Sequence, residues 1–578
     1  MRNARFVALG VTLWACGTSV PSGSRALSAA STAEATRRLP AEDFPVTVTE
    51  LEFRQERTDL RIDHAGRLSS MLPPGHYALA VTAPNGFAYV EQKLDVPGRP
   101  TIALSPDCHR VHGRVSGATA LPATVVLSRF SDDAGDRFRV AVNTAGEFAA
   151  CLPQATYSVV VEGEMASMFE SVSVPSKAAI EIAATSVAQL QQVPRDVHIA
   201  NADLASFAHA LHGRRVVGLG EANHGTGDFY RYREQLSLEL ARTGGLRSIL
   251  FEADAIGMMA IDDYVMGQDV DLVKALPALR FWVTDIQECA TFLTDVRAYN
   301  ESKPPAFRIH VLGFDAQRLE PAVQWLQAHH AELAILDHES DLLSQVTPSR
   351  GAAFTKMSSA DRTVLSSLLD RVAAPHGAPD LEGIETRASI AARALRYQLR
   401  YLEHPDERRD HTMAELATYI IEQSGAPQTA LWAHDGHLGR QTDGGEKSMG
   451  QFLAEKFDDA YYPIAFLSYQ GYGRAWDRAG QVGVIPHELW PAPAYNLESV
   501  IMNATGFIDA AWVRLDTASG PFAQWLQLPR FVREFGSAYE PSDTQHLRSF
   551  PASFAAAVVI QRGHASTPTP TGIRMLIH

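Results

Sequence analysis

The sequence contains only four cysteines, no run of basic residues and no long apolar segment. A membrane-spanning helix needs about 20 consecutive apolar residues, so a protein built around such helices is excluded. Acidic side chains outnumber basic ones, 66 against 51, and the formal net charge is −15. Because nucleic-acid binding depends on clustered Lys and Arg, we expect no nucleic-acid partner.

The small number of cysteines limits the disulfides that the protein can form. Cys108 and Cys151 lie in the same predicted β region, so we expect them to pair in an oxidising compartment. Cys289 lies in a helical pattern over residues 285–299 with no signature of a nucleophile, and we interpret it as a buried thiol.

The amino terminus has the layout of an export signal, because Arg2 and Arg5 precede a short apolar core over residues 6–15. The protein is therefore expected to be exported, either to the periplasm or to a membrane-anchored position facing the periplasm or the exterior.

Two interpretations of residues 1–31 stay open. Leu13-Trp14-Ala15-Cys16 resembles a bacterial lipobox, which implies a lipoprotein tether with an outer-membrane lipid anchor at Cys16. The other interpretation is a plain signal peptide cleaved between Ala26 and Ala30.

The remaining chain is long and apolar enough to bury several cores. It has 578 residues with 46% hydrophobic side chains, and about one domain per 150 residues predicts three or four units. Two similar segments come first: Gly66-Arg-Leu-Ser-Ser-Met-Leu-Pro-Pro-Gly-His-Tyr77 aligns with Gly146-Glu-Phe-Ala-Ala-Cys-Leu-Pro-Gln-Ala-Thr-Tyr157 at an offset of 80 positions.

Each of these segments leads into period-two apolar patterning with frequent turn residues, which is typical of small β-sandwiches. We therefore predict one module over residues 40–106 and a second over residues 107–186. Their shared pattern resembles carboxypeptidase-regulatory-type modules, which implies a spacer or docking role without chemistry.

From about Val193, short apolar runs alternate with amphipathic helices, which is typical of a parallel α/β sheet. The predicted buried strands are residues 215–219, 248–251, 308–314, 429–433 and 462–467. We predict that residues 193–578 form a three-layer α/β domain with a mainly parallel central sheet. A helical insertion over about 319–422 separates the third strand from the fourth, and we expect it to form a lid.

Ionisable residues recur where these predicted strands end. Gly220-Glu221-Ala222-Asn223-His224-Gly225 follows the first strand, Glu252 the second and Asp315 the third, while His434 and His437 follow the fourth. Ligands of open α/β sheets bind beyond the carboxyl ends of the strands. The placement therefore predicts that these side chains converge on one cleft.

The motif at residues 220–226, with Arg233 and Phe251-Glu252, resembles the opening block of the erythromycin esterase family. Further blocks occur in the family's order: residues 264–267, 281–282, 299–300, 313–317, 409–414, 432–440 and 448–453. The resemblance covers about residues 193–562. It implies a hydrolase of a carboxylic ester or a macrolide-type lactone, met as a small-molecule substrate, with no cofactor.

Residue types suggest the roles within such a site. A neutral imidazole accepts a proton, so His224 is the candidate base that activates water, with Glu221 holding its other N–H. Arg233, carried over from the family, and His437 or His434 are candidates to stabilise the oxyanion, with His437 preferred. Glu252 is expected to position the water or to orient Arg233.

Three further residues, Asp315, Gln317 and Trp282, are candidates for substrate binding, the first two equally for hydrogen-bonding framework. Arg409 and Asp410 are interpreted as a helix-terminal ion pair. No Gly-x-Ser-x-Gly elbow occurs in the α/β region, so direct water attack is preferred over an acyl-enzyme. The chain departs from the family at Asp435, where Asn is usual, and at Leu416 and Ala555, which leaves the substrate open.

Two other classes of protein remain compatible with these residues. Several His and Glu side chains suit a zinc- or manganese-dependent hydrolase of the same superfamily, although the sequence lacks His-Glu-x-x-His. A non-catalytic surface protein that binds a partner or glycan through its β modules is the second. The intact set of Glu, His and Arg residues argues against the non-catalytic surface protein.

Overall fold

The protein is described here by a computed structural model. It describes residues 44–50, 56–62, 72, 74–81, 90–96, 108–117, 124–129, 137–168, 170–176, 178–346, 352–374, 380–403, 409–441, 447–477, 483–540 and 544–570. The chain divides into two compact units, Met1–Val187 and Ala188–His578. The predicted signal segment, residues 1–31, lies outside the described residues.

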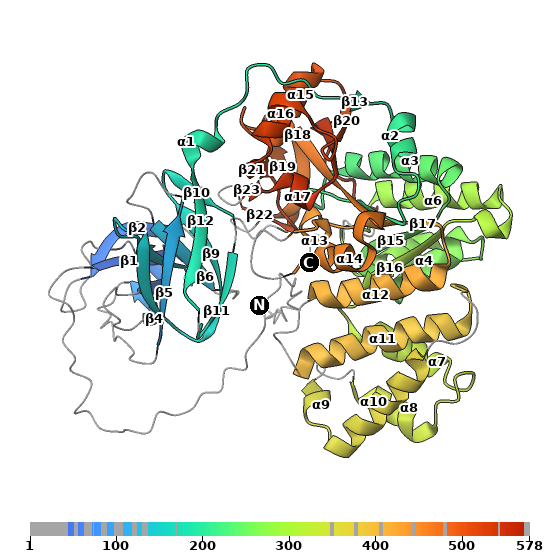
Figure 1. Ribbon diagram of the computed structural model, residues 1–578. Helices are drawn as coiled ribbons and strands as arrows, with labels where there is room; N and C mark the ends of the chain where they lie inside the picture. Colours follow the sequence, from blue (N-terminus) through green and yellow to red (C-terminus); the bar gives the residue numbers. More distant parts are fainter. Residues whose placement is uncertain are drawn as a thin grey trace, which may run out of the picture. The chain divides into compact units, whose positions relative to one another are not determined.

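The first unit contains three antiparallel or mixed four-stranded sheets (Figure 1). Strands β1 to β4 form one sheet in the order β2-β1-β3-β4, and the other two have the orders β10-β12-β5-β8 and β11-β9-β6-β7. The strands are β1 (Phe44–Glu50), β2 (Glu56–Ile62), β3 (Gly75–Val81), β4 (Val90–Val96), β5 (His109–Ser116), β6 (Thr124–Arg129), β7 (Arg137–Ala141), β8 (Glu147–Leu152), β9 (Ala155–Glu162), β10 (Met165–Ser167), β11 (Glu170–Val174) and β12 (Ile180–Ser186).

The last two sheets share one hydrophobic core. Along β5 and β12 every second residue is buried, as expected when one face of a strand meets a core and the other meets solvent. Residues of both sheets, among them Val125, Phe138, Phe148 and Ile182, belong to one hydrophobic cluster. The period-two pattern therefore predicted the strands of residues 107–186.

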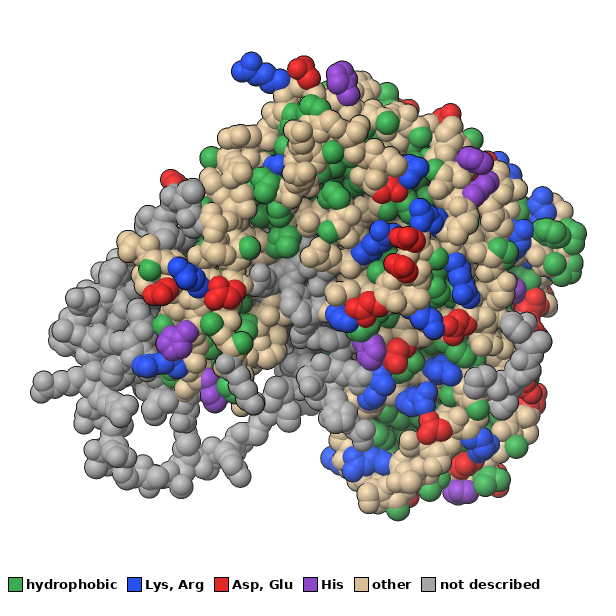
Figure 2. Space-filling view, viewed as in Figure 1, with side chains coloured by type: hydrophobic (Ala, Val, Ile, Leu, Met, Phe, Trp, Pro, Cys, Tyr) green, Lys and Arg blue, Asp and Glu red, His purple; other side chains and the backbone are tan. Residues whose placement is uncertain are grey.

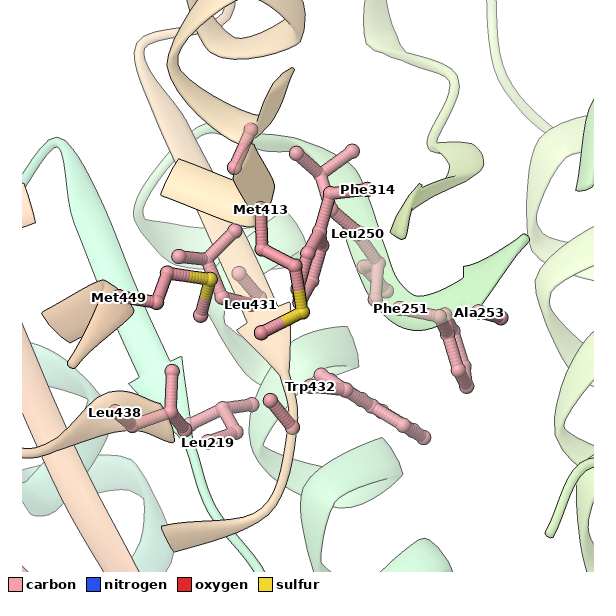
Figure 3. Packing of buried hydrophobic residues seen from close by; sticks show 14 of the residues in the cluster. Leu219, Leu250, Phe251, Ala253, Phe314, Met413, Leu431, Trp432, Leu438 and Met449 are labelled. Carbon is pink, nitrogen blue, oxygen red and sulfur yellow. The ribbon is translucent and has the colours of Figure 1, made fainter. Parts of the chain in front are cut away.

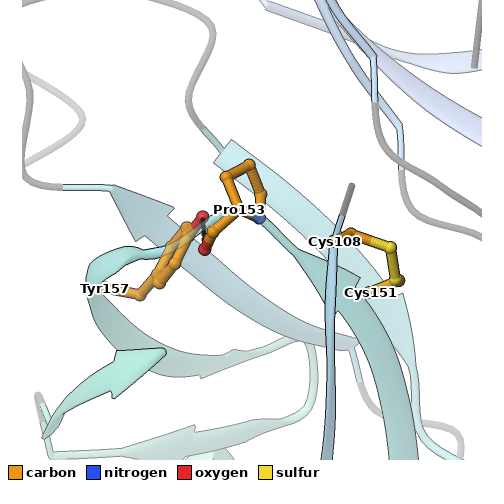
Figure 4. The surroundings of a disulfide bond; sticks show 4 residues. All are labelled: Cys108, Cys151, Pro153 and Tyr157. Carbon is orange, nitrogen blue, oxygen red and sulfur yellow. Dashed lines mark hydrogen bonds between the residues drawn. A yellow bond between two sulfur atoms is a disulfide. The ribbon is translucent and has the colours of Figure 1, made fainter. Parts of the chain in front are cut away.

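A disulfide joins Cys108 to Cys151, with their Cα atoms 5.4 Å apart (Figure 4). The predicted pairing is confirmed, and it ties the residue before β5 to β8 across 43 positions of sequence. Beside it, the Tyr157 hydroxyl donates to the Pro153 carbonyl at 3.1 Å. Closing a loop of this length removes about 4 kcal/mol of chain entropy from the unfolded state.

The second unit is built on one large sheet. Its main path runs β13-β20-β24-β18-β14-β17-β15-β16, and all pairs from β24 to β16 are parallel. The strands are β13 (Asn201–Ala202), β14 (Val216–Leu219), β15 (Leu246–Asp254), β16 (His310–Asp315), β17 (Gln428–Trp432), β18 (Tyr461–Asp477), β20 (Ala510–Arg514) and β24 (Ala556–Gly563). All five predicted strands are present.

Five strands of this ten-stranded sheet were not predicted, among them β20 and β24. These two strands are antiparallel to one another, while β24 lies parallel to β18. The alanines at positions 555–557 favour helix by intrinsic propensity, and the tertiary pairing with β18 overrides that preference. Strands β19 (Val484–Leu489) and β22 (Ala538–Tyr539) extend the sheet by pairing with the distal half of β18.

Helices flank the sheet (Figure 1), and a mixed α/β fold is confirmed. The helices outside the insertion include α3 (Gly227–Thr243), α4 (Gly257–Val265), α5 (Leu272–Ala278), α6 (Gln287–Glu301), α13 (Asp435–Leu438) and α14 (Met449–Phe457). The predicted helical insertion comprises α7 (Leu319–Ala328), α8 (Asp337–Val346), α9 (Ala352–Thr355), α10 (Ser359–Ala373), α11 (Ile384–Glu403) and α12 (Arg409–Ser424). Its last helix, α12, packs on β15, β16 and α14, so this part of the insertion belongs to the domain core.

The central strands are covered by apolar side chains on both faces. On one face Leu431 of β17 lies beside Met413 of α12 and Met449 of α14 (Figure 3), and on the other the Trp432 ring packs against Phe292 of α6, with ring centres 4.5 Å apart. All five are almost fully buried, and burial of each such side chain contributes about 1.5–3 kcal/mol. Strands that are buried on both faces read as continuous apolar runs, which is why the sequence pattern located them.

Acidic and basic side chains are interspersed on the surface, and several Lys and Arg side chains gather over α11 on the face that Figure 2 shows. Within the part of the chain that the structure describes, none of the helices combines the length and the apolar character that a bilayer crossing requires.

Asp262 joins the insertion to the core, and its removal is expected to destabilise the second unit. Its buried carboxylate accepts the Val311 amide at 2.9 Å and lies 3.5 Å from Arg387 of α11. Asp262→Ala should lower the free energy of unfolding by about 1–3 kcal/mol, because it leaves the buried Val311 amide without its acceptor.

The neighbouring Asp263→Ala is the matched control, since Asp263 binds the same guanidinium at 2.7 Å but is a third exposed; it should cost less than about 1 kcal/mol. Urea unfolding followed by tryptophan fluorescence measures both, because every tryptophan except Trp14 lies in the second unit. Equal losses for the two variants would contradict the assigned role of Asp262.

Candidate active site

The polar residues predicted to converge do so at the carboxyl ends of β14, β15, β16 and β17. The turn after β14 is held from three sides: the Ala222 amide donates to Phe466 O, the Asp435 amide donates to Glu221 O, and the Phe535 amide donates to Ala222 O. These hydrogen bonds are 2.8–2.9 Å long. The backbone that carries Glu221 and His224 is therefore fixed by β18, by the start of α13 and by the segment after β21 (Arg530–Arg533).

Two glycines of the motif are required by close approach. A Cβ on Gly220 would collide with the Asp435 carboxyl, and a Cβ on Gly225 would collide with the backbone of Arg474. Between them, the Asn223 side chain accepts the Gly225 amide at 3.2 Å and the Thr226 hydroxyl at 2.9 Å. The spacing of Gly, Asn and Gly thus follows from the turn that presents His224.

Glu221 links the imidazole of His224 to the guanidinium of Arg233. Its Oε1 lies 2.8 Å from His224 Nδ1, and its Oε2 accepts from Arg233 Nη2 at 2.8 Å. Burial opposes the charge, but Arg233 and His224 outweigh it and lower the pKa of Glu221. An ionised carboxylate only accepts hydrogen bonds, so Nδ1 carries the proton and the lone pair of a neutral His224 is on Nε2.

Arg233 lies beneath this carboxylate and is 2% exposed. Its guanidinium carbon is 4.9 Å from the ring centre of Tyr230 and 4.7 Å from that of Trp432. Its Nε–H has no hydrogen-bond partner in the described structure. Arg233 therefore neutralises Glu221 and keeps one unused donor.

Glu252 is paired with Arg409, the first residue of α12, and not with Arg233 as was considered from the sequence. Arg409 Nη2 donates to Glu252 Oε1 at 2.8 Å and to Asp315 Oδ2 at 2.6 Å. Burial opposes ionisation of Glu252, but His437 and Arg409 hold its pKa well below the usual value. The interpretation of Arg409 and Asp410 as a mere helix-terminal pair is wrong, because Arg409 bridges two strand ends.

His437 is held between two carboxylates. Its Nδ1 lies 2.8 Å from Asp410 Oδ1, and its Nε2 lies 3.5 Å from Glu252 Oε1 and 3.1 Å from Arg409 Nη1. Burial works against the charged ring, but Asp410 and Glu252 raise the pKa of His437 well above its usual value. We therefore assign a charged His437, whose approach to the Arg409 cation is compensated by the Glu252 carboxylate.

His434, unlike His437, is uncharged, and its hydrogen-bond partners are backbone groups. Its Nδ1 accepts the Gly436 amide at 3.1 Å, and its Nε2 donates to the Phe535 carbonyl at 3.2 Å. Burial lowers the pKa of His434 to about 4, so the ring is neutral. Its centre lies 5.0 Å from that of His224, which makes His434 a neighbour of the candidate base with both nitrogens already engaged.

A small cavity opens beside His224. Its free space, about 10 Å³ for the centre of a water-sized sphere, is that of about one water molecule. Carboxylates of Glu221 and Glu252 and the cation of Arg233 form one part of the lining, and the rest is mainly apolar or aromatic: Tyr230, Phe251, Phe281, Val283, Thr284 and Trp432.

The three predicted substrate-binding residues do not line this cavity. Trp282 packs with Val283 and Val484 in a separate apolar cluster. Gln317 is exposed and donates to Asp315 at 2.6 Å, while Asp315 receives Arg409 and the Ala316 amide. Asp315 therefore has the geometry of framework, and Phe281 and Val283 are the members of their segment that reach the cavity.

Sequence reasoning also missed the segment after β24, residues 564–569. The Gly227 amide donates to His564 O at 2.8 Å, the Ser566 amide to Gly225 O at 2.8 Å, and the Gln287 amide to Thr567 O at 2.7 Å. The segment thus joins the His224 turn to the start of α6, which follows the cavity wall at 281–284. Its sequence is polar and contains proline, and no pattern in it predicts a contact with the His224 turn.

Among the described residues, no group of three or more His, Cys, Asp or Glu side chains has the arrangement of a metal site. The nitrogens of His434 and His437 are occupied by backbone groups and carboxylates as given above.

Known proteins that are similar to this chain share its fold, and a family model matches its sequence. The sequence model of a family described as erythromycin esterase matches residues 242–560, more than half of the chain. The matched range begins after Glu221, His224 and Arg233, later than the start of the resemblance inferred from motifs.

Individual relatives are distant. A putative hydrolase, YbfO, of Bacillus subtilis (strain 168) is 22% identical over 378 residues, which are 58% of this chain and 82% of that protein. The crystal structure of a Bacillus cereus protein matches with a TM-score of 0.55 at 20% identity, over 64% of this chain and 94% of that chain. A structure described as a succinoglycan biosynthesis protein matches with a TM-score of 0.54 at 16% identity, over 66% of this chain and 97% of that chain.

The charge of His437 leads to a pH-dependent prediction. A raised pKa means that the ring contributes stability fully below the unfolded value of about 6.5 and loses it as the pH rises through the folded pKa. His437→Asn should therefore lower the melting temperature more at pH 6 than at pH 9. His411→Asn, at a 40% exposed site on α12, is the control and should change little at either pH. A pH-independent loss for His437→Asn would show that the ring is not charged.

Proposed function

The chain belongs to the erythromycin esterase family, and we propose that it hydrolyses a carboxylic ester or a macrolide-type lactone by attack of a water molecule that His224 activates. The family match and the putative hydrolase among its relatives support a hydrolase. The observation that carries the proposed mechanism is the buried Glu221–His224 pair, 2.8 Å apart, beside a cavity of about one water.

The base is ready for this step because its proton is on the far nitrogen. Glu221 holds Nδ1–H, so Nε2 accepts the proton of water as the water oxygen bonds to the carbonyl carbon. The Nε2 atom has no hydrogen-bond partner among the described side chains, which leaves it open to water or substrate. Glu221 then stabilises the imidazolium, and Arg233 keeps Glu221 ionised in the interior.

The tetrahedral intermediate carries its negative charge on the former carbonyl oxygen. Arg233 is the donor best placed to stabilise that charge, since it lines the cavity and has an unused Nε–H. One such donor contributes about 10²- to 10³-fold. When the intermediate collapses, the C–O bond to the leaving group breaks and the His224 imidazolium returns its proton to that oxygen. The products are a carboxylic acid and an alcohol, or one hydroxy acid from a lactone.

Glu252, Arg409 and His437 form a second group of charges beside the Glu221–Arg233 pair. Glu252 lines the cavity and is balanced by Arg409 and His437, so it can orient the attacking water without carrying an uncompensated charge. His434 supports the His224 ring from the side. Asp315 with Gln317 anchors Arg409, and Trp282 supports the wall to which Phe281 and Val283 belong.

The amino-terminal part is proposed to serve location rather than chemistry. Residues 1–31 would direct export, with or without a lipid on Cys16, and residues 40–106 and 107–186 would form two β-sandwich modules. A cleaved or lipidated protein whose catalytic region, residues 193–578, works outside the cytoplasm fits this arrangement.

Replacing the base tests the proposed function directly. His224→Ala should lower the turnover of an accepted ester by about 10²- to 10⁴-fold and leave the melting temperature nearly unchanged. The assay is a panel of aryl esters, sugar esters and macrolactones scored by the mass gain of one water. His338→Ala, at an exposed site on α8, is the control. A His224→Ala protein that retains most of its activity would rule out the base assignment.

The order of the chemical steps gives a second test. With direct water attack, alcohol release from an activated ester should be linear from the first turnover, because no covalent intermediate accumulates. Rapid quenching followed by intact-protein mass spectrometry should find unmodified enzyme. A burst of alcohol equal to the enzyme concentration, together with an acylated protein, would replace this mechanism with an acyl-enzyme.

A further inference from the structure

Asp435 occupies an unusual position for a carboxylic acid. It is the first residue of α13, directly beyond β17, and is 1% exposed. Its amide donates to Glu221 O at 2.9 Å, and its carboxyl lies against the Cα of Gly220, in the space that a Cβ there would take. Asp435 thus touches the turn that carries Glu221 and His224 twice, through its backbone and through its side chain.

The surroundings of this carboxyl do not compensate a negative charge. The Phe466 amide is near, yet neither oxygen accepts a hydrogen bond of normal geometry within the described structure. The charged groups that face it are Glu534 and Glu221, both acidic, and Arg548. Arg548 is already neutralised, because it donates to both oxygens of Glu534, with Nε 2.6 Å from Oε2.

An ionised Asp435 would therefore add a negative charge to a buried region whose nearest cation is used. A buried carboxylate without a partner costs several kcal/mol, and such a group stays protonated instead. A neutral acid of the same shape has no such cost and still fills the space beside Gly220.

We propose that Asp435 is a positioning residue that works as an uncharged acid, filling the space beside Gly220 and holding the turn from which Glu221 and His224 act. The positioning role rests on the proposed hydrolase function, whereas the charge state and the packing do not. In this arrangement the site contains two buried acids of opposite state: Glu534, ionised by Arg548, and Asp435, kept neutral.

The pH dependence of stability should distinguish the two acids. Burial, followed by Glu534, raises the pKa of Asp435 well above its usual value, so Asp435 costs stability increasingly as the pH rises above the unfolded value of about 3.9. Burial opposes the charge of Glu534, but Arg548 and His434 lower its pKa to about 2. Glu534 therefore contributes stability above the unfolded value and loses it as the pH falls.

The first experiment compares Asp435→Asn with the matched variant Glu534→Gln. Asp435→Asn should raise the melting temperature, and the gain should be larger at pH 8 than at pH 5. Glu534→Gln should lower it, because it leaves Arg548 buried without its anion. Infrared difference spectra of wild type minus Asp435→Asn at pH 7 should contain the carbonyl band of a protonated carboxylic acid. A loss of stability in Asp435→Asn, or a difference spectrum with only carboxylate bands, overturns the neutral acid.

The second experiment tests the packing by a double-mutant cycle. Gly220→Ala should be strongly destabilising in the wild type, where its Cβ meets the Asp435 carboxyl. It should be less destabilising in an Asp435→Ala background, where the remaining close neighbour is the Ile464 carbonyl oxygen at 3.0 Å. Equal effects of Gly220→Ala in both backgrounds would refute the contact as the reason for glycine.

The third experiment tests positioning. Asp435→Ala should lower kcat by about 10- to 100-fold, since small displacements of reacting groups cost this much, with little change in KM, and Asp435→Asn should restore kcat. Loss of activity in Asp435→Asn with an intact fold overturns the proposal. If wild type hydrolyses nothing in the panel while the first two experiments succeed, the proposed function fails and the assignment of a neutral, packed Asp435 stands.

Discussion

The buried charges of the candidate site are balanced by opposite charges beside them, and the site depends on this pairing. Glu221 is 4% exposed and would not stay ionised alone. The Arg233 guanidinium, itself enclosed by the Tyr230 and Trp432 rings, supplies the compensating charge. That pair decides which nitrogen of His224 carries the proton, and so it decides which nitrogen can act as a base. A mechanism that needs a neutral imidazole with a defined tautomer thus begins with a buried ion pair two turns into α3.

The same pairing of charges explains how distant segments of the chain are brought together. The strand ends supply mostly acids, Glu221, Glu252 and Asp315, and a sheet edge with three buried carboxylates needs cations from elsewhere. One comes from α3 and one from α12, the last helix of the insertion, through Arg409. The insertion is therefore a structural part of the site, since without α12 both Glu252 and Asp315 would lose Arg409.

The five central strands of the sheet and half of the site could be predicted from the sequence, for reasons that can be traced to particular residues. Parallel strands buried on both faces appear as apolar runs, and polar residues that follow such runs fall on one edge, so Glu221, His224, Glu252 and the two later histidines were found. Arg409 and Asp410 were undervalued because a helix start explains an Arg-Asp pair equally well. Trp282 was chosen over Phe281 and Val283 because sequence does not show which of three adjacent apolar side chains faces inward. Strand β24 was missed where alanine propensity and tertiary pairing disagree.

The two histidines after β17 show where sequence reasoning reaches its limit. His434 caps the short helix α13 and His437 lies within it, three residues further on, yet the first is neutral and the second charged. The difference lies in partners that come from remote segments: a backbone amide and the Phe535 carbonyl for His434, and the Asp410 and Glu252 carboxylates for His437. Asp435, between them, follows the same logic, because Arg548, the cation that faces it, is paired with Glu534. Charge state in this site is a property of the contacts and not of the residue type, so a pattern such as His-Asp-Gly-His locates the chemistry without specifying the protons.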